Sequence, residues 1–285
     1  MKNAKSEIAS DSNRNFILGV LNGTIYNFSD SLRDRYFVIP VFLLLLTDSK
    51  ILIGIASAVI IAGWYLPQAF FTKWTYVNHY KMPLYRVAAY IRIFSWCMIT
   101  ATVCLIGKIP DYLVLILFFI CLLLAYGTGG LAGIPFMDIV AKTIDQKKRS
   151  SFFAYRFITG GILSFLAGFA VKFILSENSP MKFPLNFCIL FFISTIFTAV
   201  AFFIFFGVKE PPSNNELKKN IIGKNFYKDA WKTLIQDFNF RNFYLYRFFL
   251  GIGLMSIPFI IPLGIEKLGI EKSDAGIFLA VSAII

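Results

Sequence analysis

The sequence predicts an all-α membrane protein with several spans, and three observations support this class. Hydrophobic residues make up 57% of the 285-residue chain, charged residues only 15%, and 33 residues are Phe. One soluble core cannot hide such an apolar fraction, so lipid is the expected solvent. The apolar residues gather in runs long enough to cross a bilayer as helices, and no run alternates like a strand of a β-barrel.

Seven of these runs are predicted spans, judged against the ~20 residues that a helix needs to cross the hydrocarbon. An eighth run begins at Ala275 and is cut short at Ile285, so we expect the chain to be the front portion of a longer protein. The polar N-terminal tail has no small-residue cleavage site and is expected to be retained. The seven runs are Phe16–Leu46, Ile51–Phe71, Tyr85–Ile106, Tyr112–Val140, Phe152–Leu175, Phe183–Val208 and Phe243–Ile265.

The first run contains four charges, in the stretch FSDSLRDRYFVIP from Phe28 to Pro40. The pieces on either side, Phe16–Ser29 and Tyr36–Leu46, are each too short to span alone. We therefore expect one long, tilted helix with its charges near the bilayer centre.

At 100° per residue, one face of that helix is polar through its centre. A charge facing lipid at this depth costs about 2.5–3.5 kcal/mol, so these charges must pair or face water. One interpretation is a neutralising cluster that merely holds helices together. The other, which we favour, is a substrate- and proton-binding site formed by Tyr26, Asn27, Asp30, Arg33 and Asp34.

Asp138 ends the fourth span and Arg156 begins the fifth, so both flank one short loop. We expect these two side chains to pair across helices and to latch a cytoplasmic gate. Snorkelling of Arg156 to the headgroups is the alternative.

Other motifs carry little chemistry. The glycine-rich segment Tyr126–Pro135 lacks the strand and the Lys-Ser/Thr of a phosphate loop, so close helix packing with a bend at Pro135 is expected. The single histidine, His79, lies in a polar loop. The four cysteines have no metal-site spacing and are interpreted as small buried residues: Cys97, Cys104, Cys121 and Cys188.

We therefore expect no metal site, no cofactor and no enzyme. No Ser/His/Asp arrangement or nucleotide loop is present in the sequence. Two other classes stay open, a membrane-embedded lipid-modifying enzyme and a non-transporting scaffold or receptor.

The net charge of +12 encodes orientation and does not indicate nucleic-acid binding. Seventeen Lys and Arg residues lie in the N-terminal tail and alternate loops. The loops between them carry six, namely Lys50, Lys108, Lys172, Lys182, Lys267 and Lys272. The positive-inside rule then places the N-terminus in the cytoplasm of a multi-pass protein of the cell membrane.

The longest polar interval follows the sixth span, and a repeat crosses it. Within this interval Asn225–Phe238 has the spacing of a helix lying on the membrane surface, although a solvated linker is equally compatible. An offset of 222 residues aligns Phe37–Val59 with Phe259–Val281, and matches Pro40 with Pro262. The charges before Pro40 have no counterparts in the second copy.

Six spans, a linker and a second set that begins in parallel resemble the major facilitator superfamily of secondary transporters. Locally, Gly63–Gln68, Phe136–Ile144 and Lys147–Arg156 resemble a prokaryotic permease subgroup. The expected domains are a six-helix bundle (1–208), a cytoplasmic linker (209–241) and the start of a second bundle (242–285).

The resemblance implies alternating-access transport of a small organic solute by a monomer in the lipid bilayer. Protons are the simplest coupling ion, since nothing in the sequence could hydrolyse ATP. One departure is the loop Phe71–Arg86, which lacks the glycines and the acid of the superfamily's usual pattern.

Overall fold

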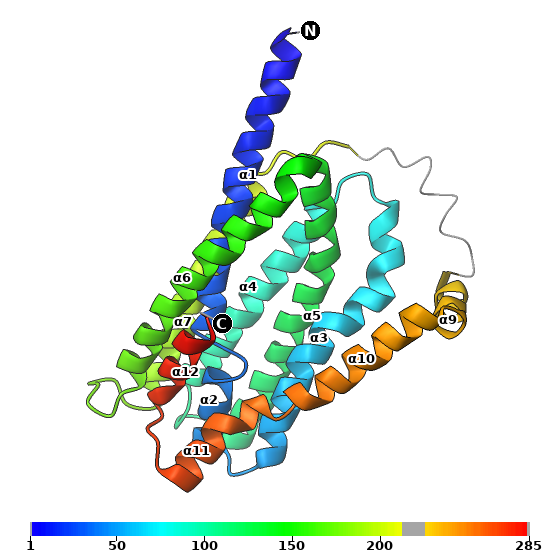
Figure 1. Ribbon diagram of the computed structural model, residues 1–285. Helices are drawn as coiled ribbons and strands as arrows, with labels where there is room; N and C mark the ends of the chain where they lie inside the picture. Colours follow the sequence, from blue (N-terminus) through cyan, green and yellow to red (C-terminus); the bar gives the residue numbers. More distant parts are fainter. Residues whose placement is uncertain (1, 213–225, 284–285) are drawn as a thin grey trace.

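The predicted spans form a bundle of long helices (Figure 1). The computed structural model describes residues 2–212 and 226–283. The expectation of an all-α membrane protein is confirmed, and the pairing of Ile106 with Ile109 is the single isolated β-bridge of the described part. Up to residue 212 the helices are α1 (Lys2–Ser31), α2 (Val38–Leu46), α3 (Lys50–Val77), α4 (Met82–Cys104), α5 (Asp111–Thr143), η1 (Gln146–Lys148), α6 (Arg149–Leu175) and α7 (Leu185–Phe206).

A second group of helices follows residue 226. The segment expected to form a surface helix contains α9, and the seventh predicted span is divided among three elements. The bounds are α9 (Phe226–Gln236), α10 (Phe238–Leu254), η2 (Ile257–Phe259), α11 (Ile260–Leu268) and α12 (Asp274–Ser282). Within the described residues, six segments are long and apolar enough to cross a membrane; they correspond to the second through seventh predicted spans.

The first predicted span is not one continuous helix, so that expectation was wrong. α1 ends at Ser31 and α2 begins at Val38. Irregular backbone at membrane depth is tolerated where it is buried in protein or lines a cavity. The arc that placed Asp30, Arg33 and Asp34 on one helical face therefore does not apply beyond Ser31.

The repeat is confirmed by the element boundaries. Adding 222 to the bounds of α2, 38–46, gives 260–268, which are the bounds of α11. The preceding helices end at Ser31 and at Leu254, so both copies break before the same proline-containing segment. The break therefore belongs to the architecture of both copies.

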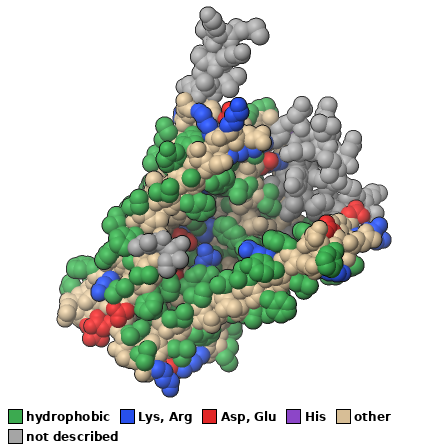
Figure 2. Space-filling model, in the orientation of Figure 1, with side chains coloured by type: hydrophobic (Ala, Val, Ile, Leu, Met, Phe, Trp, Pro, Cys, Tyr) green, Lys and Arg blue, Asp and Glu red, His purple; other side chains and the backbone are tan. Residues whose placement is uncertain are grey.

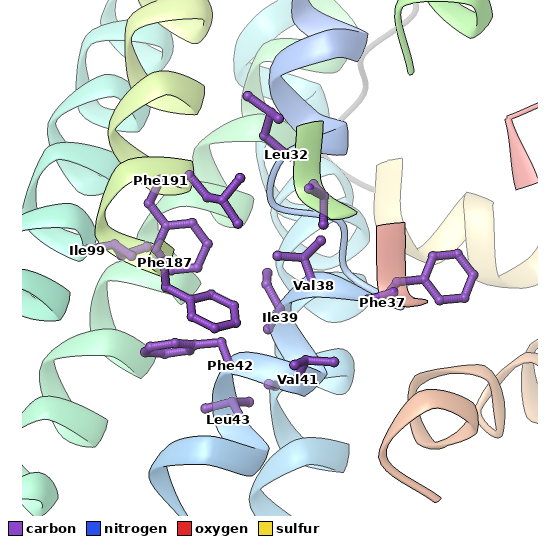
Figure 3. Close-up of a cluster of buried hydrophobic side chains, with 14 of the residues drawn as sticks. Leu32, Phe37, Val38, Ile39, Val41, Phe42, Leu43, Ile99, Phe187 and Phe191 are labelled. Atoms are coloured by element: carbon purple, nitrogen blue, oxygen red, sulfur yellow. The ribbon is translucent and has the colours of Figure 1, made fainter. Parts of the chain in front are cut away.

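Helix packing surrounds the break with aromatic side chains. α5 packs on α3 and α4, and α1 packs on α6 and α7. In Figure 3 the ring of Phe42 on α2 lies among Phe187 and Phe191 of α7, while Phe37 points to the other side. The ring centroids of Phe42 lie 5.4 Å from Phe187 and 5.6 Å from Phe191, and all three side chains are fully buried.

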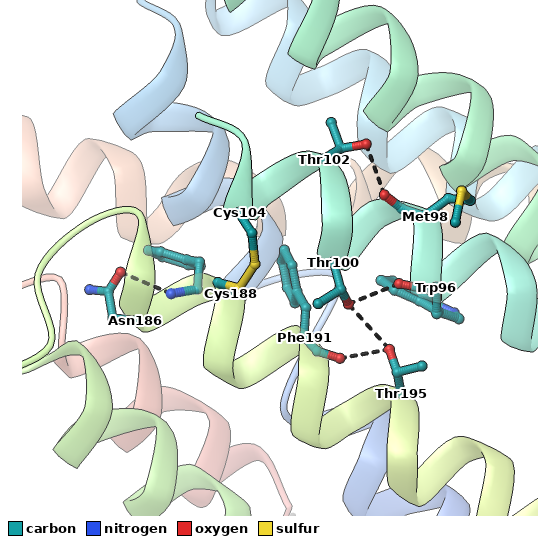
Figure 4. The surroundings of a disulfide bond; sticks show 10 residues. Trp96, Met98, Thr100, Thr102, Cys104, Asn186, Cys188, Phe191 and Thr195 are labelled. Carbon is teal, nitrogen blue, oxygen red and sulfur yellow. Dashed lines mark hydrogen bonds between the residues drawn. A yellow bond between two sulfur atoms is a disulfide. The ribbon is translucent and has the colours of Figure 1, made fainter. Parts of the chain in front are cut away.

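We call the end of the bundle from which the N-terminal segment emerges the tail end; it holds Asn15, Lys81 and Glu210. The opposite end is the disulfide end, because Cys104 at the end of α4 is bonded to Cys188 near the start of α7 (Figure 4). The interpretation of the four cysteines as small buried residues was thus wrong: two are bonded to each other, Cys97 is exposed and Cys121 is only half-buried. Spacing could not reveal the bond, since 84 positions separate the two bonded residues.

The later helices close against the first bundle at the disulfide end. α12 packs on α6 so closely that a Cβ added to Gly168 would lie 2.6 Å from the carbonyl oxygen of Gly276. Nearby, the Nζ of Lys50 on α3 lies 2.6 Å from Oε2 of Glu266 on α11. These contacts join the later helices to the first bundle at that end.

Candidate functional site

The break between α1 and α2 is stabilised by Asp34. Its Oδ1 accepts hydrogen bonds from the backbone N–H groups of Tyr36 (2.7 Å) and Phe37 (2.9 Å). Its carbonyl oxygen accepts from Val38 and Ile39. An Asp side chain that accepts from the amide two residues further on forms an Asx turn. α2 itself begins at Val38 without a side-chain cap, so Asp34 fixes the turn that leads into it, a role that sequence reasoning missed.

Arg33 points into the interior of the bundle. Its side chain is fully buried, and its Nη1 donates to Oγ of Ser194 at 2.8 Å. Its guanidinium lies 3.9 Å from the ring centroid of Trp96, a stacking worth up to about 2 kcal/mol when desolvated. Ser194 and Trp96 lie near the middles of α7 and α4, so Arg33 lies near half depth in the bundle.

Asp30 lies on the last turn of α1 and pairs with Arg33, as the i,i+3 spacing suggests. The distance from its Oδ1 to Nε of Arg33 is 3.7 Å, and its side chain is 28% exposed while that of Arg33 is closed off. Asp30 is thus the more accessible partner, and Arg33 is the side chain that positions it.

The remaining predicted residues, Tyr26 and Asn27, lie on α1 one turn before Asp30. The ring of Tyr26 lies 5.1 Å from the guanidinium of Arg92 on α4. Asn27 contacts α6 at Gly160, where an added Cβ would meet its Nδ2. The structure therefore brings Tyr26, Asp30 and Arg33 to one depth, places Asn27 against α6 and separates Asp34.

At the tail end, the expected ion pair between Asp138 and Arg156 is not formed. Asp138 lies 3.9 Å from Nζ of Lys81 and 3.7 Å from Nζ of Lys142. Arg156 instead donates to the carbonyl oxygen of Gly19 and to Oδ1 of Asn22 on α1. The side chains were expected to meet because they flank one loop, but the guanidinium of Arg156 packs on α1 at Gly23, where no Cβ obstructs it.

Glu210 completes the tail-end cluster of Lys81, Asp138, Lys142 and Glu210. Its buried carboxylate accepts from the backbone N–H groups of Lys81 and Met82 and from Nζ of Lys142 at 2.6 Å. Sequence reasoning had assigned Glu210 to the linker. The available signal was a lone acid directly after an apolar span and before two prolines.

Two further features bear on chemistry. A cavity of about 780 Å³ opens at the tail end, lined by the start of α1, the end of α5 and residues 209–211, away from Asp30. Figure 2 shows acidic and basic side chains in the hollowed middle of the visible face, between α6 and α10. Among the described residues, no group of three or more His, Cys, Asp and Glu could hold a metal ion.

Comparison with known proteins gives one informative match. No family model and no curated protein matches the sequence. The crystal structure of a D-xylose–proton symporter superposes with a TM-score of 0.60 at 14% identity and covers 97% of this chain. The chain spans 66% of the symporter's length. The likeness confirms the expected fold: over the matched part, the chain shares the helical architecture of this symporter.

Proposed function

We propose that the chain forms part of a secondary active transporter that moves a small organic solute by alternating access, coupled to protons. The observation that carries this proposal is the interrupted first span, with Asp30 and Arg33 at half depth in a bundle that shares its fold with a proton symporter. Interrupted helices at half depth are the usual place for substrate and ion sites in transporters. Intramembrane charges are retained mainly where they serve function.

Asp30 is the proton-exchanging group of the proposal. It is partly exposed and pairs with one buried cation, Arg33. Tyr26 and Asn27 supply polar contacts to the solute from the same helix, and Asp34 holds the break in place.

The two ends of the bundle are the gates of the proposal. The disulfide end is closed here by the contact of Gly168 with Gly276 and by the ion pair of Lys50 with Glu266. At the tail end, Asp138 acts through Lys81 and Lys142, while Arg156 ties α6 to α1. In this proposal the protein is a monomer in the cell membrane, with one bundle at 1–208 and a second from 242. The tail end and the 209–241 linker face the cytoplasm.

Proton flux into liposomes tests this function. Full-length protein is reconstituted around a trapped pH-sensitive dye, and sugars, amino acids, carboxylates and phosphate are added outside. At least one solute class should drive proton entry, and Asp30→Asn should reduce it at least tenfold because the exchanging carboxylate is lost. Arg33→Ala should reduce it too, with membrane insertion intact.

The matched control is Asp145→Asn, which removes an exposed carboxylate between α5 and α6. It should leave the flux within twofold of the wild type. Wild-type flux in the Asp30→Asn variant, or no flux with any solute class, would contradict the proposal.

A further inference from the structure

Arg92 is a buried cation enclosed by aromatic rings. It lies at the middle of α4 and is 3% exposed. Its guanidinium carbon lies 5.1 Å from the ring of Tyr26 on α1, 5.7 Å from Trp64 on α3 and 5.6 Å from Tyr126 on α5. Three helices thus place aromatic faces around one positive charge. We call Tyr26, Trp64 and Tyr126 the aromatic cage.

The cage stabilises the charge but leaves the guanidinium donors without acceptors. An arginine side chain carries five N–H donors, and ring faces do not replace oxygen acceptors. Over residues 2–212 and 226–283, Arg92 has no acidic side chain within ion-pair distance and no hydrogen-bond partner, and its Nε is buried without one.

Arg33 and Arg156, two other arginines inside the bundle, each have an oxygen partner, although Nε and Nη2 of Arg33 are also buried without a hydrogen bond. Arg33 has Asp30 and Ser194, and Arg156 has oxygens of Gly19 and Asn22. Arg92 differs from Arg33 and Arg156 in that none of its nitrogens has an oxygen partner among the described residues.

The local charge balance leaves a positive excess around Arg92. Asp30 lies beside Arg33, and the side chain of Asp34 binds backbone amides. Neither carboxylate reaches Arg92. An unpaired guanidinium in a region of low dielectric attracts an anion strongly, since arginine matches carboxylate and phosphate oxygens in pairs.

The backbone of α5 makes room for this arrangement. A Cβ added to Gly129 would lie 2.4 Å from Nη1 of Arg92 and 2.8 Å from a ring carbon of Trp64. The glycine-rich segment interpreted as a packing motif therefore also accommodates the cation. Tyr26 and Trp64 are only half-buried, whereas Arg92 is buried.

We infer that Arg92 is the solute-binding cation and that it takes an anionic group, a carboxylate or a phosphate, on the transported solute. The inference rests on the proposed transport function and names its substrate class. The aromatic cage holds the cation in place and excludes water around the bound anion. Arg33, in contrast, positions Asp30.

Equilibrium binding to the purified full-length protein tests the inference without requiring transport. Tryptophan fluorescence and thermal unfolding are followed during titration with benzoate and inorganic phosphate. D-xylose and choline serve as neutral and cationic probes at equal ionic strength. At least one of the two anions should bind, and Arg92→Gln should weaken it at least tenfold, with Arg92→Lys intermediate.

Two variants make the result specific. Arg86→Gln removes the same charge from the same helix, at an exposed position over the ring of Phe206, and should keep the anion affinity within twofold. Gly129→Ala keeps the charge but displaces the guanidinium, so it should also weaken the anion. Gel filtration checks that each variant is folded. If Arg92→Gln does not fold, the anion affinity of Gly129→Ala alone tests the anion site.

The outcomes separate this inference from the proposed function. Failure of both anions to bind, or equal affinity in the wild type, Arg92→Gln and Gly129→Ala, overturns the anion site. Anion binding through Arg92 without any proton flux into liposomes keeps the site and overturns the transport function. Proton flux driven by neutral solutes alone keeps the transport function and overturns the anion site.

Discussion

At the residue scale, the carboxylate of Asp34 has a structural role that its charge does not reveal. Asp34 lies in a charged stretch, which suggested a substrate or proton site. In the structure its Oδ1 binds the amides of Tyr36 and Phe37. Asp30, four residues earlier, has no such role and remains partly exposed. The two acids therefore differ because the backbone breaks between them.

The role of Asp34 as acceptor in the turn predicts different outcomes for two substitutions. Asp34→Ala removes the acceptor and should lower stability by about 0.5–1.5 kcal/mol, the usual net contribution of a hydrogen bond. Asp34→Asn keeps an acceptor oxygen and should lose much less. Thermal unfolding of the purified variants measures both. If the two variants were equally destabilised, the negative charge would be the stabilising feature and the acceptor role would be wrong.

At the element scale, the α6–α12 contact depends on the absence of side chains. A Cβ at Gly276 would lie 2.3 Å from the carbonyl oxygen of Gly168 and 2.4 Å from the amide nitrogen of Lys172. Both are backbone atoms and cannot move aside without shifting a helix. Small residues allow membrane helices to approach in this way. The two helices can approach this closely because both positions are glycine.

We therefore expect Gly276→Val to force the disulfide end open. The clash should cost about 1–3 kcal/mol, the usual range for overpacking, and should destabilise the closed state selectively. A reporter cysteine at Phe37, which is buried beside Phe278, would then react with maleimide faster than in the parent. The background for this measurement is Cys97→Ser with Cys121→Ser.

Gly251→Ala on α10 is the control, because an added Cβ there meets nothing within 4 Å. Its labelling rate should equal that of the parent. Unchanged labelling in Gly276→Val would show that this contact does not keep the end closed.

At the scale of the whole molecule, charge and sulfur chemistry point to the same orientation. The basic loops lie with the tail end, and the disulfide joins α4 to α7 at the opposite end. Disulfides persist in oxidising compartments and are rare in the cytosol. Positive residues favour the cytoplasmic side. From both rules we propose that the tail end lies inside and the disulfide end outside.

This orientation predicts a sidedness of labelling in intact cells. In the Cys97→Ser, Cys121→Ser background, a cysteine at Lys50 should react with an impermeant maleimide, and one at Asp145 only after permeabilisation. Cys104 and Cys188 should react only after reduction, as a gel shift with a polymer-linked maleimide. Reaction of both without reductant would exclude the bond, and external labelling at Asp145 would invert the orientation.

The sequence by itself determined the class, the helices and the repeat. Long apolar runs can satisfy their backbone groups in lipid only as helices. The match of Pro40 with Pro262 revealed the two copies, because each copy is a continuous stretch of sequence. Arg92 could be seen as an intramembrane charge, but its cage joins Tyr26, Trp64 and Tyr126 from three other helices.

Only the tertiary structure decided where the charges point and what they contact. The helical arc failed because the chain breaks after Ser31, and the second copy breaks at Leu254 without charges there. Asp138 pairs with Lys81 and not with Arg156, and Cys104 is bonded to Cys188. Each of these contacts joins residues far apart in the chain. Periodicity reports the faces of a single helix, whereas packing between helices selects the partners.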